Sequence, residues 1–421
     1  MSTGPDDIDF PGFSFQPIGR RQTGALELLL PTALAQTLRK EQVARAGALE
    51  AACRASEEMR RSNAAPASAG PVAPAAAHGA ANREMFIAYF ERDVTRRNPR
   101  RRHPVLRGEE LFRVMTRIST LRDKENQKRE MELLKKLEAV GPLRDVVNPM
   151  LRRARWERAL QQLRDAHPHF SKVTDFVARQ IALWAHSRRP LRLVPMHLWG
   201  SPGIGKTLYA NDLAQALGAP LRRHSMENAQ TTSLLLGTER HWSTACQGLV
   251  FEEVCVGKVA NPVFLIDELD KAPRAAQYDP LAPLHSLLEP ITARRVRDAS
   301  LDIEFDASLV TFVATSNDPA KVPETLRSRF REFHILPPTG AQALQVAHVV
   351  AAAAVIQLGV PGFASPNSTI CRYLAHLTAR EIHQVVQDAV AQALCVERRH
   401  LTVADFSEEI AGAGETQSKL H

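Results

Sequence analysis

With 421 residues, 44% of them hydrophobic and 24% charged, the chain has the composition of a soluble globular protein of two or three domains. Its net charge of +8 favours an acidic partner (nucleic acid, an anionic surface or an acidic protein) without choosing among them. The five cysteines lack C-x-x-C spacing, no apolar run approaches the ~20 residues of a membrane span, and the N-terminus lacks a signal-peptide pattern. These features argue against a zinc site, a disulfide framework and membrane insertion, and they predict a cytoplasmic protein.

The first 82 residues are predicted to be partly helical and partly disordered. They open with a polar stretch, rich in Pro and Gly, that reaches about Gln22. A helix is predicted from Pro31 to about Arg61, because Pro31 suits a first helical turn and leucines follow at helical spacing. Residues 62–82 are rich in Ala, Pro and Gly and offer nothing bulky to bury, which predicts a linker.

Residues 83–165 are predicted to form a helical and basic region. Two interpretations stay open for the arginine-rich run from Arg96 to His103: a solvated turn broken by Pro99, or a patch that binds nucleic acid. Apolar residues at three- and four-residue intervals predict one long amphipathic helix from Glu109 to Val140, used for packing or a coiled coil. A further helix is predicted from Pro149 to Leu163.

From Ala166 onward, strand-like and helix-like runs alternate. After an amphipathic helix, the apolar runs MHLW, VFLID and LVTFVATS are separated by the helix-like runs NDLAQALG and LHSLLEPI. This alternation predicts a parallel sheet flanked by helices, an α/β domain over residues 166–337. Beyond Pro338 the strand signal stops, so residues 338–410 are predicted to form a small all-helical domain, followed by a tail over residues 411–421.

A phosphate-binding loop is predicted between MHLW and the helix that follows it. The sequence GSPGIGKT matches the pattern G-x-x-x-x-G-K-[ST] in full, and the strand before it and helix after it argue against a chance glycine-rich turn. Glycines let backbone N–H groups approach phosphate oxygens, and the helix N-terminus adds favourable potential. Lys206 is expected at the β- and γ-phosphates of ATP, and the Thr207 hydroxyl on Mg²⁺. The residues expected to contact the nucleotide are Gly200, Ser201, Pro202, Gly203, Ile204, Gly205, Lys206, Thr207 and Leu208.

Two carboxylates follow the apolar run VFLI, at the C-terminal end of a predicted buried strand, where α/β sheets bind ligands. We expect Asp267 to hold Mg²⁺, directly or through its waters, and Glu268 to orient and deprotonate the attacking water. At the end of the next buried strand, Asn317 is expected to hydrogen-bond the γ-phosphate or that water. The sequence Ser-Asn-Asp-Pro is also a good turn, which is the alternative for Asn317.

Together these motifs resemble the AAA+ ATPases, and among them the ATPase module of the Lon protease family, from about Phe170 to Phe406. The strongest Lon-like run is NPVFLIDELDK, from Asn261 to Lys271. The segment LGTERHWSTA resembles the family's aromatic pore loop, which implies that Trp242 grips a substrate, although a packing role is the alternative. The resemblance implies a P-loop sheet, a helical lid, and a ring of identical subunits, six in number, with ATP between neighbours.

The resemblance also implies roles for two arginines. The segment VPETLRSRF resembles the one that carries the arginine finger, which implies that Arg329 stabilises charge on the phosphoryl group in the neighbouring subunit's site. Arg327 is the alternative finger. The segment TAREI resembles the sensor-2 segment, which implies that Arg380 approaches the γ-phosphate from the lid, whereas an ordinary surface arginine is the other interpretation.

Three functional hypotheses follow. The first is an ATP- and Mg²⁺-dependent ATPase whose ring remodels or unfolds a protein substrate. Lon proteases carry a peptidase domain after this module, and the short sequence after Phe406 leads us to expect no intrinsic proteolysis. The second hypothesis is an ATPase associated with nucleic acid through the basic N-terminal region. The third is a regulatory switch whose nucleotide state controls assembly.

Overall fold

The computed structural model describes residues 13–21, 24–31, 76–118, 124–148, 153–228, 233–238, 246–273 and 279–406. The chain divides into two compact units. The first comprises residues 1–97, 104–143 and 301–304, and the second comprises residues 98–103, 144–300 and 305–421. Among the described residues, no helix combines the length and the apolar character that crossing a membrane requires.

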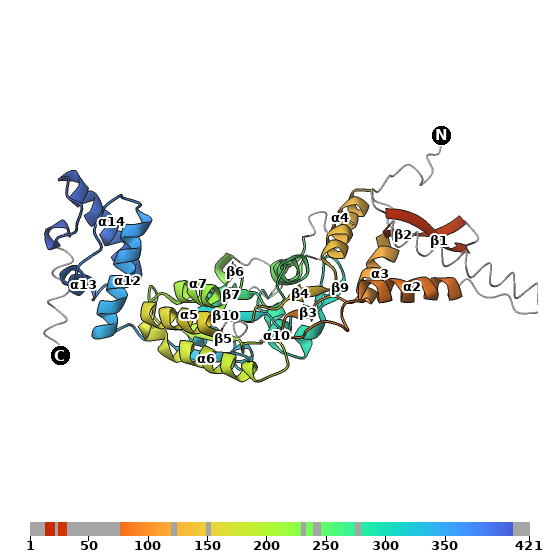
Figure 1. Cartoon of the computed structure of the whole chain (residues 1–421), viewed down its shortest axis with the longest axis horizontal. Helices are drawn as coiled ribbons and strands as arrows, with labels where there is room; N and C mark the ends of the chain where they lie inside the picture. The colour runs from red at the N-terminus through yellow and green to blue at the C-terminus, as the bar shows by residue number, and fades with distance from the viewer. Residues whose placement is uncertain are drawn as a thin grey trace, which may run out of the picture. The chain divides into compact units, whose positions relative to one another are not determined.

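A five-stranded parallel sheet forms the centre of the second unit, which confirms the predicted α/β fold (Figure 1). The strands lie in the order β11-β5-β10-β7-β6. Two of them, β6 and β11, were not predicted from the sequence, because both are short edge strands with mostly polar side chains. The bounds are β5 Met196–Trp199, β6 Leu221–Ser225, β7 Val263–Asp267, β10 Thr311–Ser316 and β11 Arg331–His334.

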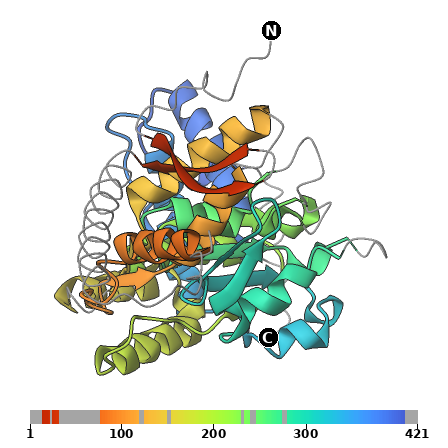
Figure 2. The same cartoon turned by 90° about the vertical axis from the view of Figure 1, so that its right-hand side faces the viewer.

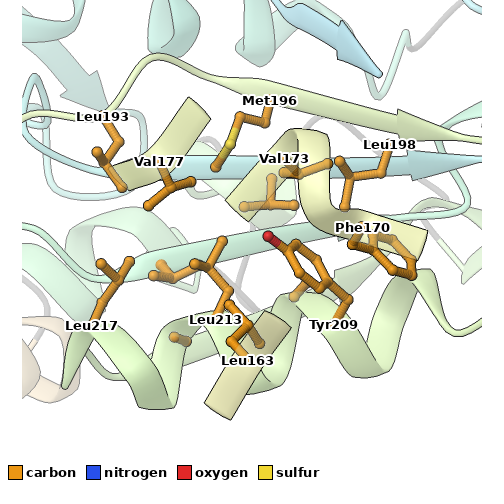
Figure 3. Packing of buried hydrophobic residues seen from close by; sticks show 14 of the residues in the cluster. Leu163, Phe170, Val173, Val177, Leu193, Met196, Leu198, Tyr209, Leu213 and Leu217 are labelled. Carbon is orange, nitrogen blue, oxygen red and sulfur yellow. The ribbon is translucent and has the colours of Figure 1, made fainter. Parts of the chain in front are cut away.

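Three helices pack against one face of this sheet (Figure 3). They are α5 Arg153–Ala166, α6 Ser171–Ala185 and α7 Lys206–Leu217. The buried ring of Tyr209 stacks on Phe170 with ring centroids 4.3 Å apart, and its hydroxyl lies 2.9 Å from Thr174 Oγ1. Met196, Leu265 and their neighbours from alternate strand positions complete this core, so α7 and the loop before it are held firmly against the sheet.

The remaining part of the second unit that follows the sheet is helical, as the sequence predicted. It contains α12 Ala341–Gln357, α13 Ser368–Leu374 and α14 Ala379–Cys395, which share a buried apolar cluster of their own. The Thr378 side chain accepts a hydrogen bond from the Glu381 N–H, and the Glu381 carboxylate accepts one from the Thr378 N–H. This reciprocal capping box fixes where α14 begins.

The first unit departs from the sequence prediction in three places. Strands β1 Phe13–Arg21 and β2 Gly24–Pro31 pair antiparallel (Figure 2). Strand β1 lies in the predicted polar stretch, and β2 occupies residues for which no element was predicted, up to the Pro31 at which the predicted helix begins. Helix α2 Ala76–Phe90 begins inside the predicted linker. The single helix predicted up to Val140 is two helices, α3 Gly108–Ile118 and α4 Lys124–Val140.

Two of these differences, at β2 and between α3 and α4, have an origin in the sequence pattern. Leu26, Leu28 and Leu30 alternate with a period of two, and this strand signal competes with the helical spacing of the leucines after Pro31. The remainder of the helix predicted from Pro31 lies outside the described residues. Apolar spacing continues through the gap between α3 and α4, so the period alone could not reveal the break.

Short elements complete the described chain. The other strands are β3 Arg102–Pro104, β4 Leu143–Asp145, β8 Val296–Asp298 and β9 Ile303–Phe305. The short helices are α8 Ser233–Leu236, α9 Leu249–Phe251, α10 Ala282–Leu288 and α11 Glu324–Arg327. Of these, α11 ends at Arg327, and Arg329 follows two residues later.

Glu138 on α4 gives the first unit a testable pH dependence. Burial raises the pKa of this carboxyl from 4.5 to about 7. A carboxyl whose folded-state pKa is raised favours folding below its unfolded-state pKa, and this contribution is lost as the pH rises through the folded-state pKa. Glu138→Gln should therefore raise the melting temperature relative to wild type, and the gain should grow between about pH 5 and about pH 8. Glu132→Gln, at an exposed site on the same helix, is the control. An equal gain at both pH values would contradict the expectation.

Candidate functional site

The loop between β5 and α7 has a shape that only glycine permits at two positions. Gly205 precedes α7 with a φ of 92°, in the left-handed region that other residues rarely adopt. A Cβ added to Gly200 would lie 2.2 Å from the Ile335 carbonyl oxygen. The loop therefore wraps closely against the sheet, and the backbone at the start of α7 is free of side-chain bulk.

The Lys206 side chain lies within this loop and is largely buried. Its Nζ donates to the Gly200 carbonyl at 2.8 Å, to the Ser201 carbonyl at 2.9 Å and to Asn317 Oδ1 at 2.9 Å. Burial lowers the pKa of Lys206, and the nearby carboxylates of Asp270 and Asp267 act against that shift. The loop and the end of β10 thus meet at one ammonium group.

Asp267, at the end of β7, is almost fully buried and has three partners. The Thr207 hydroxyl lies 3.2 and 3.1 Å from its two carboxylate oxygens, and the Thr315 hydroxyl also donates to it. Arg223 on β6 reaches Asp267 Oδ2 with a guanidinium nitrogen at 2.6 Å. Sequence reasoning missed Arg223 because β6 was not recognised as a strand. Its register would have pointed to it, since Ser225 lies opposite Asp267 and Arg223 therefore shares that face.

Glu268 follows directly and has an unusual backbone conformation. Its φ of 57° is left-handed, and its N–H donates to Thr315 Oγ1 at 3.2 Å. The carboxylate is 31% exposed and lies 2.9 Å from Lys271 Nζ. The hydrogen bond from Lys271 lowers the pKa of Glu268, so this carboxyl is ionised at neutral pH. A left-handed conformation is costly for a non-glycine residue, and such residues cluster at functional sites, although Asp302 and Glu397 also adopt it here.

Asn317 is held by a residue that the sequence did not single out. The backbone N–H groups of Asn317 and Asp318 both donate to Asp270 Oδ2 at 3.1 Å. This carboxylate ties the end of β10 to the turn after β7, and it keeps the Asn317 side chain beside Lys206. Its position three residues after Asp267 was visible in the sequence, but its partners were not.

The predicted arginines lie apart from this cluster. Arg329 follows α11, and its guanidinium donates to the Thr325 carbonyl. Arg327 instead forms a two-point ion pair with Glu332, at 2.8 and 2.9 Å. Arg380 is exposed in the first turn of α14, two residues after Thr378. Among the described residues, neither Arg329 nor Arg380 is hydrogen-bonded to the cluster around Lys206, and Trp242 lies outside them.

The structure therefore brings together five of the residues that sequence reasoning selected, at the C-terminal end of the sheet. They come from the start of α7 and from the ends of β7 and β10, and they are Lys206, Thr207, Asp267, Glu268 and Asn317. The arrangement offers an ammonium group, a hydroxyl beside a buried carboxylate, and a second, ionised carboxylate. These are the groups required to hold a charged phosphate chain with a hard cation and to activate a water molecule.

Comparisons with known proteins agree with this geometry. Residues 196–338 match the family described as ATPase family associated with various cellular activities (AAA). The Lon protease of Campylobacter concisus is 33% identical over 148 residues, which cover 35% of this chain and 18% of that protein. Lon protease 2 of Thermus thermophilus is 31% identical over 202 residues, covering 45% and 25% respectively. The match thus spans a quarter or less of the length of these relatives.

Solved structures show a more distant likeness. The RuvB Holliday junction branch migration motor of Thermotoga maritima is 17% identical, with a TM-score of 0.37, over 62% of this chain and 68% of that one. A mutant of the same protein gives a TM-score of 0.40 at 16% identity, over 58% and 69% respectively. A likeness of this size says nothing about function. The family match, the Lon relatives and the site geometry together show that the chain contains an AAA ATPase domain homologous to the ATPase region of Lon proteases.

Proposed function

We propose that this chain binds ATP with Mg²⁺, hydrolyses it, and works as a ring of identical subunits that remodels or unfolds a protein substrate. The observation that carries the proposal is the meeting of Lys206, Asn317, Thr207 and Asp267 at one end of the sheet. Residues from the start of α7 and from the ends of β7 and β10 have no packing reason to gather polar and charged groups there. A bound polyphosphate with its metal ion gives that reason.

The residues present fit ATP and Mg²⁺. The loop wraps so closely that a Cβ at Gly200 would clash with the Ile335 carbonyl, and Lys206 lies inside it. Loops of this kind bind phosphate oxygens with their backbone N–H groups. Thr207 and Asp267 supply the oxygen donors that Mg²⁺ prefers. When bound, Mg²⁺ neutralises charge on the phosphate oxygens. Lys206 then binds those oxygens, while Thr207 and Asp267 hold the metal ion.

Glu268 and Asn317 complete the reaction. The Glu268 carboxylate is ionised and partly exposed, so it orients the attacking water and accepts its proton. The Asn317 amide, fixed beside Lys206, positions the γ-phosphate or that water. Arg380, near the start of α14, approaches the γ-phosphate from the helical domain. Consistent with this, a Cβ added to Gly203 of the loop would lie 3.4 Å from the Thr378 side chain.

Arg329 is the arginine that we assign to the neighbouring subunit's site. Arg327 is committed to Glu332 within its own subunit, whereas Arg329 makes no ion pair with any described residue. A guanidinium supplied by a neighbour stabilises charge on the transferred phosphoryl group, so hydrolysis depends on assembly. This assignment favours Arg329 over Arg327 on a physical ground that the sequence did not provide.

Replacement of Glu268 separates nucleotide binding from hydrolysis. Glu268→Gln should leave the Kd for ATP unchanged and slow turnover at least about a hundredfold, because the amide cannot accept the proton of the attacking water. Calorimetry with Mg·ATP measures binding, and phosphate release measures turnover. Glu324→Gln, at an exposed site at the start of α11, is the matched control. Unchanged turnover in Glu268→Gln would remove this residue from the mechanism.

Replacement of Arg329 tests the shared site. Arg329→Ala should bind ATP normally and hydrolyse it at least about 10³-fold more slowly. Arg331→Ala is the control, because Arg331 lies two residues away and its side chain is exposed. Arg329→Ala subunits mixed with Glu268→Gln subunits should regain part of the activity, since some interfaces then combine an intact Glu268 with an intact Arg329. Normal turnover by Arg329→Ala alone would refute the assignment.

A protein substrate is favoured by the similarity to Lon proteases. The resemblance of LGTERHWSTA to the aromatic pore loop of that family implies that Trp242 contacts this substrate. The nucleic-acid alternative depends on the run from Arg96 to His103, and several of its charges have intramolecular partners. Arg100 donates to the carbonyls of Ala185 and Ser187. Arg102 pairs with Asp145 and His103 with Asp306. These contacts favour a structural turn over a free cationic patch.

The ATPase rate distinguishes the substrate classes. An unfolded protein should raise the rate, while single-stranded DNA and RNA should leave it unchanged. Stimulation by DNA or RNA alone, weakening steeply with salt, would establish the nucleic-acid alternative instead. Slow turnover with tight ATP binding and no stimulation by either would favour the regulatory switch.

A further inference from the structure

A continuous chain of polar contacts crosses the sheet beside the proposed catalytic groups. The Ser316 hydroxyl lies 2.7 Å from His197 Nε2, and His197 Nδ1 lies 3.1 Å from Glu332 Oε1. Glu332 in turn forms the two-point ion pair with Arg327. The chain runs through three neighbouring strands, β10, β5 and β11, and ends on α11.

Strand register explains why these side chains meet. Glu332 lies directly opposite His197 on one side, and Ala314 lies opposite it on the other. Ser316 is two residues beyond Ala314, so it points to the same face of the sheet as His197. Thr315, between them, points to the opposite face, where it donates to Asp267. The polar chain thus lies on one face of the sheet, and the contact of β10 with the proposed metal ligand Asp267 lies on the other.

The protonation state of His197 determines which groups donate and which accept along the polar chain. The imidazole is fully buried, and burial lowers its pKa, so it is neutral at physiological pH. One tautomer satisfies both partners: Nδ1–H donates to the Glu332 carboxylate, and Nε2 accepts from the Ser316 hydroxyl. Both nitrogens of the His197 ring then have a hydrogen-bond partner, which makes the polar chain rigid. An apolar residue at position 197 would fill this space without needing such partners.

The polar chain connects two residues that belong to different nucleotide sites in the proposed ring. Asn317 serves the site of its own subunit, and Arg329 serves the site of the neighbouring subunit. Ser316 precedes Asn317, whose side chain accepts from Lys206. At the other end, Arg327 and Glu332 enclose residues 328–331, so their ion pair closes the short segment that carries Arg329. A displacement of Asn317 therefore has a direct mechanical route to Arg329.

We propose that His197, Glu332 and Arg327 are positioning residues that couple the contact between Asn317 and the nucleotide to the placement of Arg329. The coupling rests on the proposed ATPase function. As a result, the nucleotide bound to one subunit controls where that subunit places Arg329 in the site of its neighbour. These residues touch neither nucleotide nor water, and they act only through Asn317 and Arg329.

The test is a double-mutant cycle on purified full-length protein. Arg327→Ala and Glu332→Ala should each lower kcat at least about tenfold, because a displaced catalytic group costs rate even when it is present. The Kd for Mg·ATP should stay at the wild-type value. In an Arg329→Ala background, the same two substitutions should have no further effect on kcat. Glu332→Gln, which keeps an acceptor for His197 but weakens the ion pair, should give an intermediate kcat.

Controls separate positioning from stability. His197 is fully buried and its replacement risks unfolding, so the partly exposed Arg327 and Glu332 carry the test. Arg331→Ala, on the same strand as Glu332, should leave kcat unchanged. Melting temperatures of all variants identify any loss of kcat that comes from unfolding. Such a loss would also appear in the Arg329→Ala background.

Each outcome is decisive. Wild-type kcat in Arg327→Ala and Glu332→Ala, with Arg329→Ala inactive, would overturn the coupling and leave the proposed ATPase intact. Losses that add fully to that of Arg329→Ala would also overturn it. A wild-type protein with no ATPase activity would overturn the proposed function, and the coupling with it.

Discussion

A single ammonium group, that of Lys206, joins the elements of the candidate site. It donates to two carbonyls of the glycine-rich loop and to the Asn317 side chain at the end of β10. A buried charge needs such partners, because its burial without them costs several kcal/mol. The loop, the start of α7 and the end of β10 are therefore constrained together. A change in these hydrogen bonds of Lys206 therefore affects both the loop and Asn317.

The end of β10 carries side chains that contact three different parts of the structure. Three consecutive side chains at its end go to three places: Thr315 to Asp267, Ser316 to His197, and Asn317 to Lys206. Alternation along the strand sends the first two to opposite faces of the sheet. One strand end thus contacts the proposed metal ligand, the proposed phosphate-binding lysine and the polar chain that leads to α11. Under the proposed function, the end of β10 is therefore where a nucleotide contact would be transmitted to α11.

Sequence reasoning succeeded where one local signal dominated. Apolar runs such as VFLID predict buried strands, and the long helices after Pro338 show an uninterrupted helical pattern. It failed where signals were weak or mixed. Edge strands β6 and β11 carry mostly polar residues, and the leucines of β2 suit both a strand and a helix. Tertiary pairing settles such segments, because an edge strand is stabilised by its neighbour's backbone rather than by its own side chains.

By itself, the sequence singled out the glycine-rich loop, the acidic pair of Asp267 and Glu268, and the family they indicate, because each motif is contiguous and its spacing reflects its chemistry. Only the tertiary structure decided that Arg223 reaches Asp267, that Asp270 fixes Asn317, and that His197 connects Ser316 to Glu332. It also decided that Arg327 is paired within its own subunit. Arg327 and Glu332 are close in sequence, but the other partners come from distant segments, and the order and register of the sheet, which no local period encodes, bring them together.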